Sequence, residues 1–366
     1  KKKKKKEGKK QKIIIAGCVP QAEKKLIETK LRKYSVIGVG QINKICEAVD
    51  NALKNKRTVF LENTNPLAKI NEKKRTNKII GIIPLSKGCL GNCTYCKTKQ
   101  ARGNLVSYPV KEIRLAVEEA LKSGAKEIWL TSQDTAAYGQ DINQNIIILL
   151  KELIKIKGDF KIRLGMGNPS FFKKYCDELI KIFKFPKMFK FMHIPIQSGS
   201  DKILKKMKRK YKISDAVKTI KKIRENIKDL TIATDIIVGF PGETEDDFKK
   251  TLSAVKKITP EVLNISRFWA RPGTEAAKMK NKISGKESKK RGIILKKEFK
   301  QIALEENKKW LGWTGKVLID EIGKFSDFKG RNYAYKQVII KPLKNQEIKM
   351  HHSKLFPFTF NHSILS

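Results

Sequence analysis

Three of the six cysteines in this chain lie together in the short stretch GCLGNCTYC, residues 88–96. Cys89, Cys93 and Cys96 follow the spacing CxxxCxxC, and the stretch holds no histidine and no fourth cysteine. The chain shows no signal-peptide core, so we expect a cytoplasmic protein. In that reducing compartment, clustered thiols indicate a metal site or redox chemistry rather than structural disulfides.

Two kinds of metal site are compatible with three thiolates at this spacing. A structural zinc ion takes four ligands, so zinc would need a further Cys or His from a distant part of the chain. A four-iron cluster is normally held by four thiolates. Three thiolates would leave one iron with an open position, and an open position makes a metal site reactive. The triplet therefore favours an iron–sulfur cluster and leaves zinc as the alternative.

The segments around this loop are typical of a parallel α/β sheet. The stretch KIIGIIPLS, residues 78–86, is expected to be a strand that leads into the cysteines. Strand-like and helix-like segments then alternate about six times, as in sheets of parallel strands joined by helices. Six units are too few for an eight-stranded barrel, so we predict a partial, open barrel. The cysteines would lie at the carboxyl ends of its strands, where such barrels carry their chemistry.

The fold class that we predict is α/β with three folded parts. Strand and helix patterns, linker composition and a final run of short strands give these boundaries. We expect a basic low-complexity tail at 1–11, a small α/β domain at 12–63, a linker at 64–76, the barrel domain at 77–305 and a small β-barrel at 306–366.

The chain is strongly basic, with 81 Lys and Arg against 36 Asp and Glu and a net charge of +45. Such an excess favours a polyanionic partner, most simply nucleic acid. An AT-rich genome would also enrich Lys, Ile and Asn, and this drift is an alternative source of part of the charge. No run of 18 apolar residues occurs, so we predict no membrane association.

Several strings resemble the radical S-adenosylmethionine (SAM) family, beginning with the cysteine triplet and Tyr95 before its last member. The longer string GCLGNCTYCKTKQARGNLVSYP resembles the methylthiotransferase branch. It is most similar to the archaeal and eukaryotic enzymes that modify N6-threonylcarbamoyladenosine beside the tRNA anticodon. Further strings match in the same order: EIWLTSQDTAAYGQD, RLGMGNP, HIPIQSGSD, IATDIIVGFPGETEDDF and RPGTEAAKM.

This resemblance implies that Cys89, Cys93 and Cys96 bind a [4Fe–4S] cluster whose open iron holds SAM. The cluster and SAM would supply the radical needed to attack an unactivated C–H carbon, so no further catalytic side chain is expected. The residues expected to contact SAM are Tyr95, Ser132, Gln133, Asp134, Asn168, Gln197, Ser198 and Gly239. Ordinary turn residues are the alternative for the polar members of this set.

Three other residues, a histidine and two cysteines, are expected to have structural roles only. His193 is expected to be a core histidine with a satisfied hydrogen bond. Cys46 and Cys176 match no ligand of the family, so we expect both to be buried and inert.

Cys18, in KIIIAGCVPQ, matches the third of three cysteines that hold a second [4Fe–4S] cluster in the family's N-terminal domain. The two earlier cysteines would lie upstream, and residues 1–11 contain none. We therefore expect this sequence to be truncated at its N-terminus. In the full-length protein, Cys18 would be one ligand of the second cluster.

The C-terminal segment resembles the TRAM domain, a small β-barrel that binds tRNA in this family, through the string KGRNYAYKQVII. Lys329, Arg331 and Lys336 would contact phosphates, and Tyr333 and Tyr335 would stack on unpaired bases. An ordinary strand with solvated basic residues is the alternative.

The resemblance as a whole implies a transferase that adds a methylthio group to C2 of N6-threonylcarbamoyladenosine in tRNA. Such an enzyme would require tRNA and an electron donor such as ferredoxin or flavodoxin. Two alternatives are a methylthiotransferase for isopentenyl-adenosine in tRNA and a tRNA-binding remnant that is inactive in sulfur insertion.

Overall fold

The computed structural model describes residues 11–62, 70, 75, 77–323, 327–340 and the strand 356–359. The predicted tail and most of the predicted linker therefore lie outside the described residues. The sequence pattern also predicts a strand in EIKMHHSKLF, residues 347–356, and nearly all of it lies outside them too. Within the described residues, no helix combines the length and the apolar character needed to cross a membrane.

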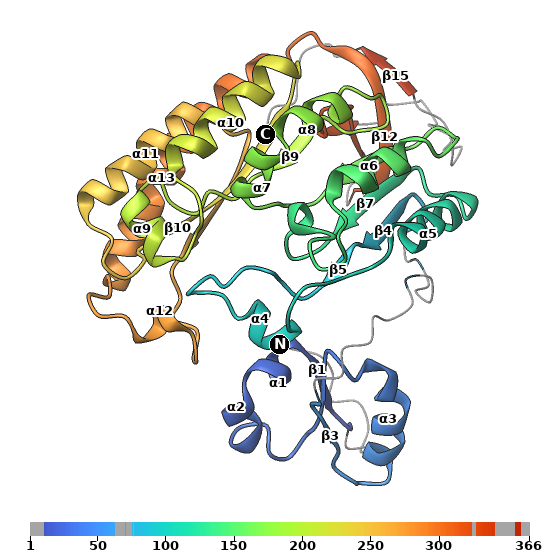
Figure 1. Cartoon of the computed structure of the whole chain (residues 1–366), viewed down its shortest axis with the longest axis vertical. Coiled ribbons are helices and arrows are strands. Elements are labelled where there is room, and N and C mark those ends of the chain that lie inside the picture. The colour runs from blue at the N-terminus through green and yellow to red at the C-terminus, as the bar shows by residue number, and fades with distance from the viewer. Residues whose placement is uncertain are drawn as a thin grey trace.

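The N-terminal part is a small parallel sheet in the order β1-β2-β3 (Figure 1). Its strands are β1 (Ile14–Gly17), β2 (Ser35–Gly38) and β3 (Val59–Phe60), and its helical segments are α1 (Cys18–Ala22), α2 (Lys24–Glu28), η1 (Ile42–Lys44) and α3 (Ile45–Leu53). Val36 and Ile37 of the central strand are fully buried. The apolar periodicity of residues 22–34 predicts one helix there, and this prediction was wrong. The chain breaks at Glu23, and α2 ends where the hydroxyl of Thr29 donates a hydrogen bond to the carbonyl of Lys25.

The central part contains the six parallel strands that the sequence pattern predicted. They are β4 (Ile80–Pro84), β7 (Glu127–Thr131), β8 (Lys161–Leu164), β9 (Phe191–His193), β10 (Thr231–Val238) and β11 (Val262–Arg267). Pairing gives the orders β4-β7-β8 and β9-β10-β11, and a parallel bridge between Ile162 and Met188 joins the two halves. The strands thus form an arc with β4 and β11 as its edges, which confirms the mixed α/β architecture.

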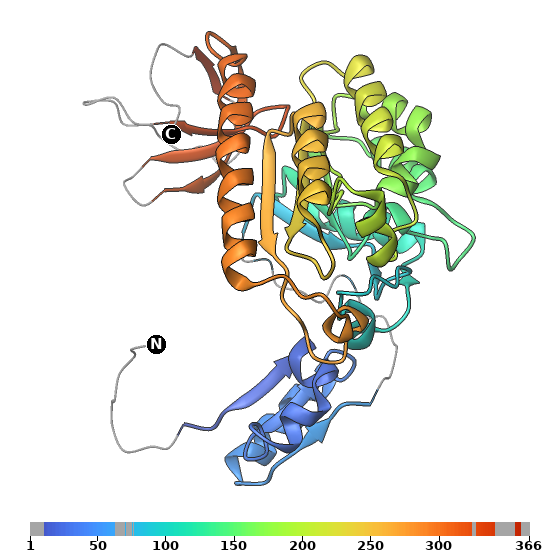
Figure 2. The ribbon, with the colours of Figure 1, turned by 90° about the vertical axis from the view of Figure 1, so that its left-hand side faces the viewer.

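Helices cover the outer face of this arc (Figure 2). They are α5 (Val110–Lys122), α6 (Ile146–Ile154), α7 (Pro169–Lys174), α8 (Cys176–Phe183), α9 (Asp201–Lys206), α10 (Ile213–Asn226), α11 (Glu245–Ile258) and α13 (Gly285–Lys308). Helix α5 shows why: its buried residues Ile113, Ala116, Val117 and Ala120 recur at helical spacing and form one apolar face. This face packs into the main core together with Ile128 and other strand residues.

The C-terminal part is an antiparallel sheet in the order β14-β13-β12-β15. Its strands are β12 (Thr314–Ile322), β13 (Phe328–Arg331), β14 (Gln337–Ile340) and β15 (Phe356–Thr359). Tyr335 joins this sheet to the barrel, because its ring lies 4.9 Å from the ring of Phe189 and 5.0 Å from that of Phe191. Both phenylalanines lie at the amino-terminal end of β9, so the sheet sits at the end of the barrel opposite the cysteine loop (Figure 1).

Glu127 is an acid buried at the same junction, with 0% of its surface exposed. The indole N–H of Trp129 donates a hydrogen bond to one carboxylate oxygen, and the carboxylate also interacts with Tyr335. Burial raises the pKa of Glu127 from 4.5 to about 7, and the nearby charge of Asp320 adds to this shift. The folded protein therefore holds a proton that the unfolded chain releases.

The wild type should lose stability as the pH rises, and we predict that Glu127→Gln abolishes this loss. Because the pKa of Glu127 is raised in the folded state, the stability that depends on its protonated form is fully present below pH 4.5. It is lost as the pH rises through about 7. A shift of this size corresponds to about 3 kcal/mol. Denaturant unfolding at pH 4.5 and pH 8 measures the difference, with the exposed Glu119→Gln as control. Equal pH dependence in the wild type and Glu127→Gln would contradict the prediction.

Candidate functional site

The cysteine loop is closed at its base by a short antiparallel pair. Strands β5 (Ser86–Lys87) and β6 (Val106–Ser107) flank the loop, and α4 (Thr98–Arg102) lies between them. Gly88 has a φ of +71°, and a Cβ atom there would lie 1.9 Å from the carbonyl oxygen of Asn104. Only glycine fits at this position. The backbone that leads from β4 into Cys89, the first cysteine of the triplet, is therefore held in a fixed conformation.

The three thiols are free and partly buried. A Cβ atom on Gly91 would lie 3.6 Å from Sγ of Cys89 and 3.9 Å from Sγ of Cys93, so this glycine keeps the space between them clear. The N–H of Thr98 donates to Sγ of Cys96 at 3.4 Å. Burial raises the pKa of the Cys89 thiol, so a bound metal would be needed to hold it as a thiolate.

This donor set fits a four-iron cluster better than a single ion. Among the described residues, no group of three or more His, Cys, Asp or Glu side chains is close enough to hold one metal ion. A zinc ion would require its sulfur ligands about 2.3 Å from one point. In a four-iron cluster each thiolate binds a different iron, so the sulfurs lie further apart.

Arg209 is a site residue that the sequence analysis missed. Its Nη1 lies 3.6 Å from Sγ of Cys93, and its Nη2 donates to the carbonyl of Pro195 at 3.1 Å. Its Nε lies 3.5 Å from the hydroxyl of Tyr211. The guanidinium of Arg209 thus connects Sγ of Cys93 to the barrel wall. Its only sequence signal is a single arginine inside the lysine-rich string MKRKY.

Thr94 fastens the middle of the loop to two helices. Its hydroxyl donates to the carbonyl of Lys206 at 2.9 Å, and its N–H donates to the carbonyl of Met207 at 3.3 Å. Its carbonyl accepts the N–H of Ala276, which belongs to α12 (Glu275–Lys278), at 3.0 Å. The loop between the second and third cysteines is therefore anchored on both sides.

The polar residues that follow β7 lie next to this loop. Oε1 of Gln133 is 3.5 Å from Oγ1 of Thr98, and the hydroxyl of Ser132 accepts the N–H of Asp134 at 3.2 Å. Oδ1 of Asp134 accepts the N–H of Asn168 at 3.0 Å, and burial raises the pKa of Asp134. The structure brings these predicted residues together with the cysteines. Their contact with SAM stays a prediction.

Asn168, Ser198 and Gly239 also have structural duties. The side-chain oxygen of Asn168 caps α7 by accepting the N–H of Ser170 at 3.2 Å. Ser198 is 1% exposed, and its hydroxyl lies 3.5 Å from that of Thr251 on α11. Gly239 has a φ of +76°, and a Cβ atom there would meet the hydroxyl of Ser288 on α13 at 2.1 Å. Close packing of α13 is thus enough to require this glycine.

A pocket of about 360 Å³ opens inside the barrel beside the cysteine loop. Tyr95, Gln197, Asp235 and Asn264 are among its lining residues. Oδ1 of Asp235 lies 2.9 Å from Nε2 of His193 and accepts from Nδ2 of Asn264 at 2.8 Å. Burial alone would raise the pKa of Asp235, but the contacts with His193 and Asn264 outweigh it and lower that pKa. The pocket lining therefore includes an ionised carboxylate, and His193 has the partner that we expected.

The N-terminal part contacts the barrel beside the cysteine loop. Nζ of Lys97 donates to the carbonyl of Ala22 at 3.1 Å and forms an ion pair with Glu23. Cys18 begins α1, the helix that packs against α4. Among the remaining cysteines, Cys176 is buried as expected, whereas Cys46 is exposed, so its expected burial was wrong.

The five residues predicted to bind tRNA do not gather with the cysteines. Lys329 pairs with Glu321 at 3.1 Å, and the guanidinium of Arg331 lies 4.9 Å from the ring centre of Tyr335. Further contacts tie Lys336 to Asn307 at 3.0 Å and Tyr333 to Asp229 at 2.5 Å. All five have intramolecular contacts near the junction with the barrel. Their role in RNA binding stays a prediction.

Comparison with known proteins yields one protein-family match and many similar sequences. A model of the Radical SAM superfamily matches residues 83–255. The probable threonylcarbamoyladenosine tRNA methylthiotransferase of Pyrococcus horikoshii is 38% identical over 92% of this chain and 80% of its own length. The threonylcarbamoyladenosine tRNA methylthiotransferase of Homo sapiens is 40% identical over 90% of this chain, which spans 58% of the human protein.

Solved structures support the fold alone. The radical S-adenosylmethionine methyltransferase TsrM from Kitasatospora setae matches with a TM-score of 0.53 at 14% identity, over 70% of this chain and 56% of that one. The cobalamin-dependent S-adenosylmethionine radical enzyme OxsB matches with a TM-score of 0.51 at 11% identity, over 79% of this chain and 43% of that one.

A buried ion pair holds the glycine-rich turn that ends β10. The carboxylate of Glu243 accepts the N–H of Gly239 at 3.2 Å and pairs with Nη1 of Arg291 on α13 at 2.5 Å. Burial raises the pKa of Glu243, and the contact with Arg291 opposes that shift. Both side chains are almost completely buried, so neither charge has water as an alternative partner.

We predict that Arg291→Met destabilises the protein by about 3–5 kcal/mol, because it leaves the charge of Glu243 buried without its partner. Changing both residues, in Glu243→Gln with Arg291→Met, should recover part of this loss. The pair of Lys256 on α11 and Glu298 on α13 is much more exposed and provides the control. Lys256→Met should cost less than about 1 kcal/mol. Denaturant unfolding compares the variants, and equal effects of Arg291→Met and Lys256→Met would contradict the prediction.

Proposed function

Since this chain belongs to the threonylcarbamoyladenosine tRNA methylthiotransferases of the Radical SAM superfamily, we propose that it adds a methylthio group to C2 of N6-threonylcarbamoyladenosine in tRNA. The observation that carries this function is the cysteine loop at the carboxyl ends of the barrel strands, beside a pocket. That arrangement supports radical chemistry on a bound nucleoside, and the relatives' names supply the nucleoside.

Cys89, Cys93 and Cys96 would hold a [4Fe–4S] cluster, and Gln133 and Asp134 would face the polar end of SAM. When bound, the cluster and SAM supply the radical that removes hydrogen from an unactivated carbon, and SAM supplies the methyl group. Aromatic side chains beside the cysteine loop would limit the access of water to this region. Tyr95 contacts Phe240 at 6.3 Å between ring centres, and Phe240, which is fully buried, contacts Phe268 at 5.2 Å.

The remaining parts would serve the same reaction. We assign residues 12–63 to a sulfur-delivering domain, with Cys18 as one ligand of a second cluster in the complete protein. The packing of α1 against α4 supports this assignment, because it brings the helix of Cys18 towards the first cluster. Residues 306–366 would be a TRAM domain that contacts tRNA. An external reductant such as ferredoxin or flavodoxin would supply electrons.

Product analysis tests the proposed function directly. The complete protein, reconstituted with iron and sulfide under anaerobic conditions, should convert N6-threonylcarbamoyladenosine in tRNA to its 2-methylthio derivative, as detected by mass spectrometry. Cys93→Ala should lose about four irons per chain and all product, because the cluster loses a ligand. Cys46→Ala changes an exposed thiol outside the site and should retain both. Two outcomes would contradict the proposal. The first is a methylthio product only on isopentenyl-adenosine, and the second is no product although the clusters are loaded.

Arg209 gives a second prediction, for the cluster itself. Its guanidinium lies 3.6 Å from Sγ of Cys93 and should stabilise the more negative, reduced cluster. A hydrogen bond to a charged group contributes about 1.5–3 kcal/mol. Because 59 mV corresponds to a factor of ten for one electron, Arg209→Gln should lower the midpoint potential by on the order of 60 mV or more.

A redox titration followed by electron paramagnetic resonance, without SAM, measures this shift. Arg209→Lys keeps the charge and should shift the potential less. Lys208→Gln changes the neighbouring exposed cation and should leave it unchanged. An unaltered potential in Arg209→Gln with full iron content would show that the guanidinium does not act on the cluster.

A further inference from the structure

An exposed tryptophan stands at the mouth of the barrel pocket. Trp269 follows β11 and has 78% of its surface exposed, more than any other large apolar side chain in the described part of the chain. It lines the pocket together with Tyr95 of the cysteine loop. A large aromatic ring is costly to leave in water, and such rings in nucleic-acid-binding proteins stack on unpaired bases.

Two arginines flank this tryptophan and line the same pocket. Arg267 is the last residue of β11, and Arg271 follows two residues after Trp269. Both are exposed. Within the described ranges, neither guanidinium has a hydrogen bond or an ion pair. Most arginines elsewhere, including Arg114, are held by an acid or a carbonyl.

The free guanidinium groups indicate an anionic ligand of matching shape. Arginine presents a planar fork of donors that binds a carboxylate through two parallel hydrogen bonds. The threonylcarbamoyl group of the proposed substrate ends in a carboxylate, whereas unmodified adenosine has no negative charge on its base. The lining of the pocket also includes the carboxylate of Asp235, held by His193 and Asn264, which disfavours a second carboxylate beside it. The carboxylate would therefore be bound at the mouth.

We propose that Arg267 and Arg271 bind the carboxylate of the threonylcarbamoyl group while Trp269 stacks on a base of the same RNA loop. This inference rests on the proposed function and names the residues that would determine its substrate specificity. The enzyme would recognise the completed modification by its negative charge. The arginines are binding residues, and they act before the radical step. A reaction that attaches an amino acid through a carbamoyl link must therefore precede this one.

The test compares two RNA hairpins of one anticodon-loop sequence, with N6-threonylcarbamoyladenosine or adenosine at the target position. Fluorescence anisotropy at fixed salt gives both dissociation constants for the iron-loaded protein. The wild type should prefer the modified hairpin. Arg267→Gln with Arg271→Gln should reduce this preference by about ten- to a hundredfold, as expected for charge-assisted hydrogen bonds. Arg32→Gln, an exposed arginine of the N-terminal part, is the matched control.

The arginines could instead bind one of two other anionic groups, and the same variants distinguish these cases. If the arginines bind RNA phosphates, the double variant will weaken both hairpins equally, which would overturn the inference. The methionyl carboxylate of SAM is the second source. If the arginines bind it, the variant will lose affinity for SAM measured by equilibrium dialysis without RNA, which would also overturn it.

Failure of this inference is distinguishable from failure of the proposed function. If the wild type forms the methylthio product but the double variant keeps the full preference for the modified hairpin, only the inference fails. If the wild type prefers the modified hairpin and the variant does not, yet no product forms, only the proposed function fails. Iron content and unfolding curves of the variants check that these exposed substitutions leave the fold intact.

Discussion

The contact between a buried guanidinium and a cysteine sulfur fixes the geometry on which the rest of the site depends. The cysteine loop contains almost no regular structure between β5 and α4, so backbone hydrogen bonding alone cannot position its thiols. Arg209 holds Cys93 from the barrel side, and Thr94 fixes the loop to α9 and α12. Burying this charge is costly, and that cost is offset only while Pro195 and Tyr211 accept its remaining donors. The loop is therefore anchored around the three cysteines that we propose as cluster ligands.

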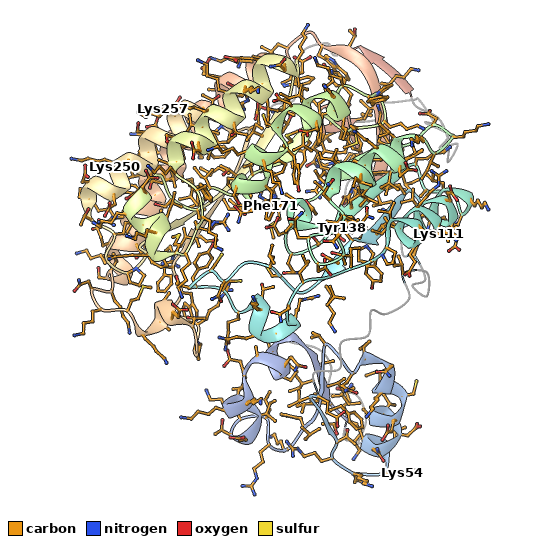
Figure 3. All side chains as sticks on the ribbon, viewed as in Figure 1. Lys54, Lys111, Tyr138, Phe171, Lys250 and Lys257 are labelled. Atoms are coloured by element: carbon orange, nitrogen blue, oxygen red, sulfur yellow. The ribbon has the colours of Figure 1, made fainter. Side chains whose placement is uncertain are left out.

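Parallel strands explain how distant segments reach this loop. Each strand of the arc delivers its following residues to the same end of the barrel, so Asp134 and Asn168 meet although 33 residues separate them in the sequence. The opposite end is used for assembly, where Tyr335 and Glu127 join the C-terminal sheet to the barrel. Much of the positive charge lies on outer surfaces, as Lys54, Lys111 and Lys250 project from three different elements (Figure 3). The candidate site and the junction with the C-terminal sheet thus occupy opposite ends of the barrel.

The alternation of strands and helices could be predicted from sequence, because apolar periodicity reflects local burial. The cysteine loop could also be predicted, since its signal lies within one short stretch. Arg209 could not, because its role arises only when α9 folds back against the loop. The contact of Asp235 with Asn264 depends on the register of β10 against β11, which no single segment encodes. Packing of α13 near Gly239 and the inward position of Tyr335 depend on tertiary structure in the same way.

Lysine is so frequent in this chain that a single lysine says little about function, whereas the scarcer arginines are informative. Arg209, Arg224 and Arg291 each make several contacts that a lysine ammonium could not reproduce, because a planar fork can bind several acceptors at once. Their positions are determined by the protein itself. Arg267 and Arg271 have the same chemistry but no such contacts among the described residues, and they stand beside an exposed tryptophan at a pocket mouth. A guanidinium without an internal partner at such a place is best explained by a ligand that brings the acceptor with it.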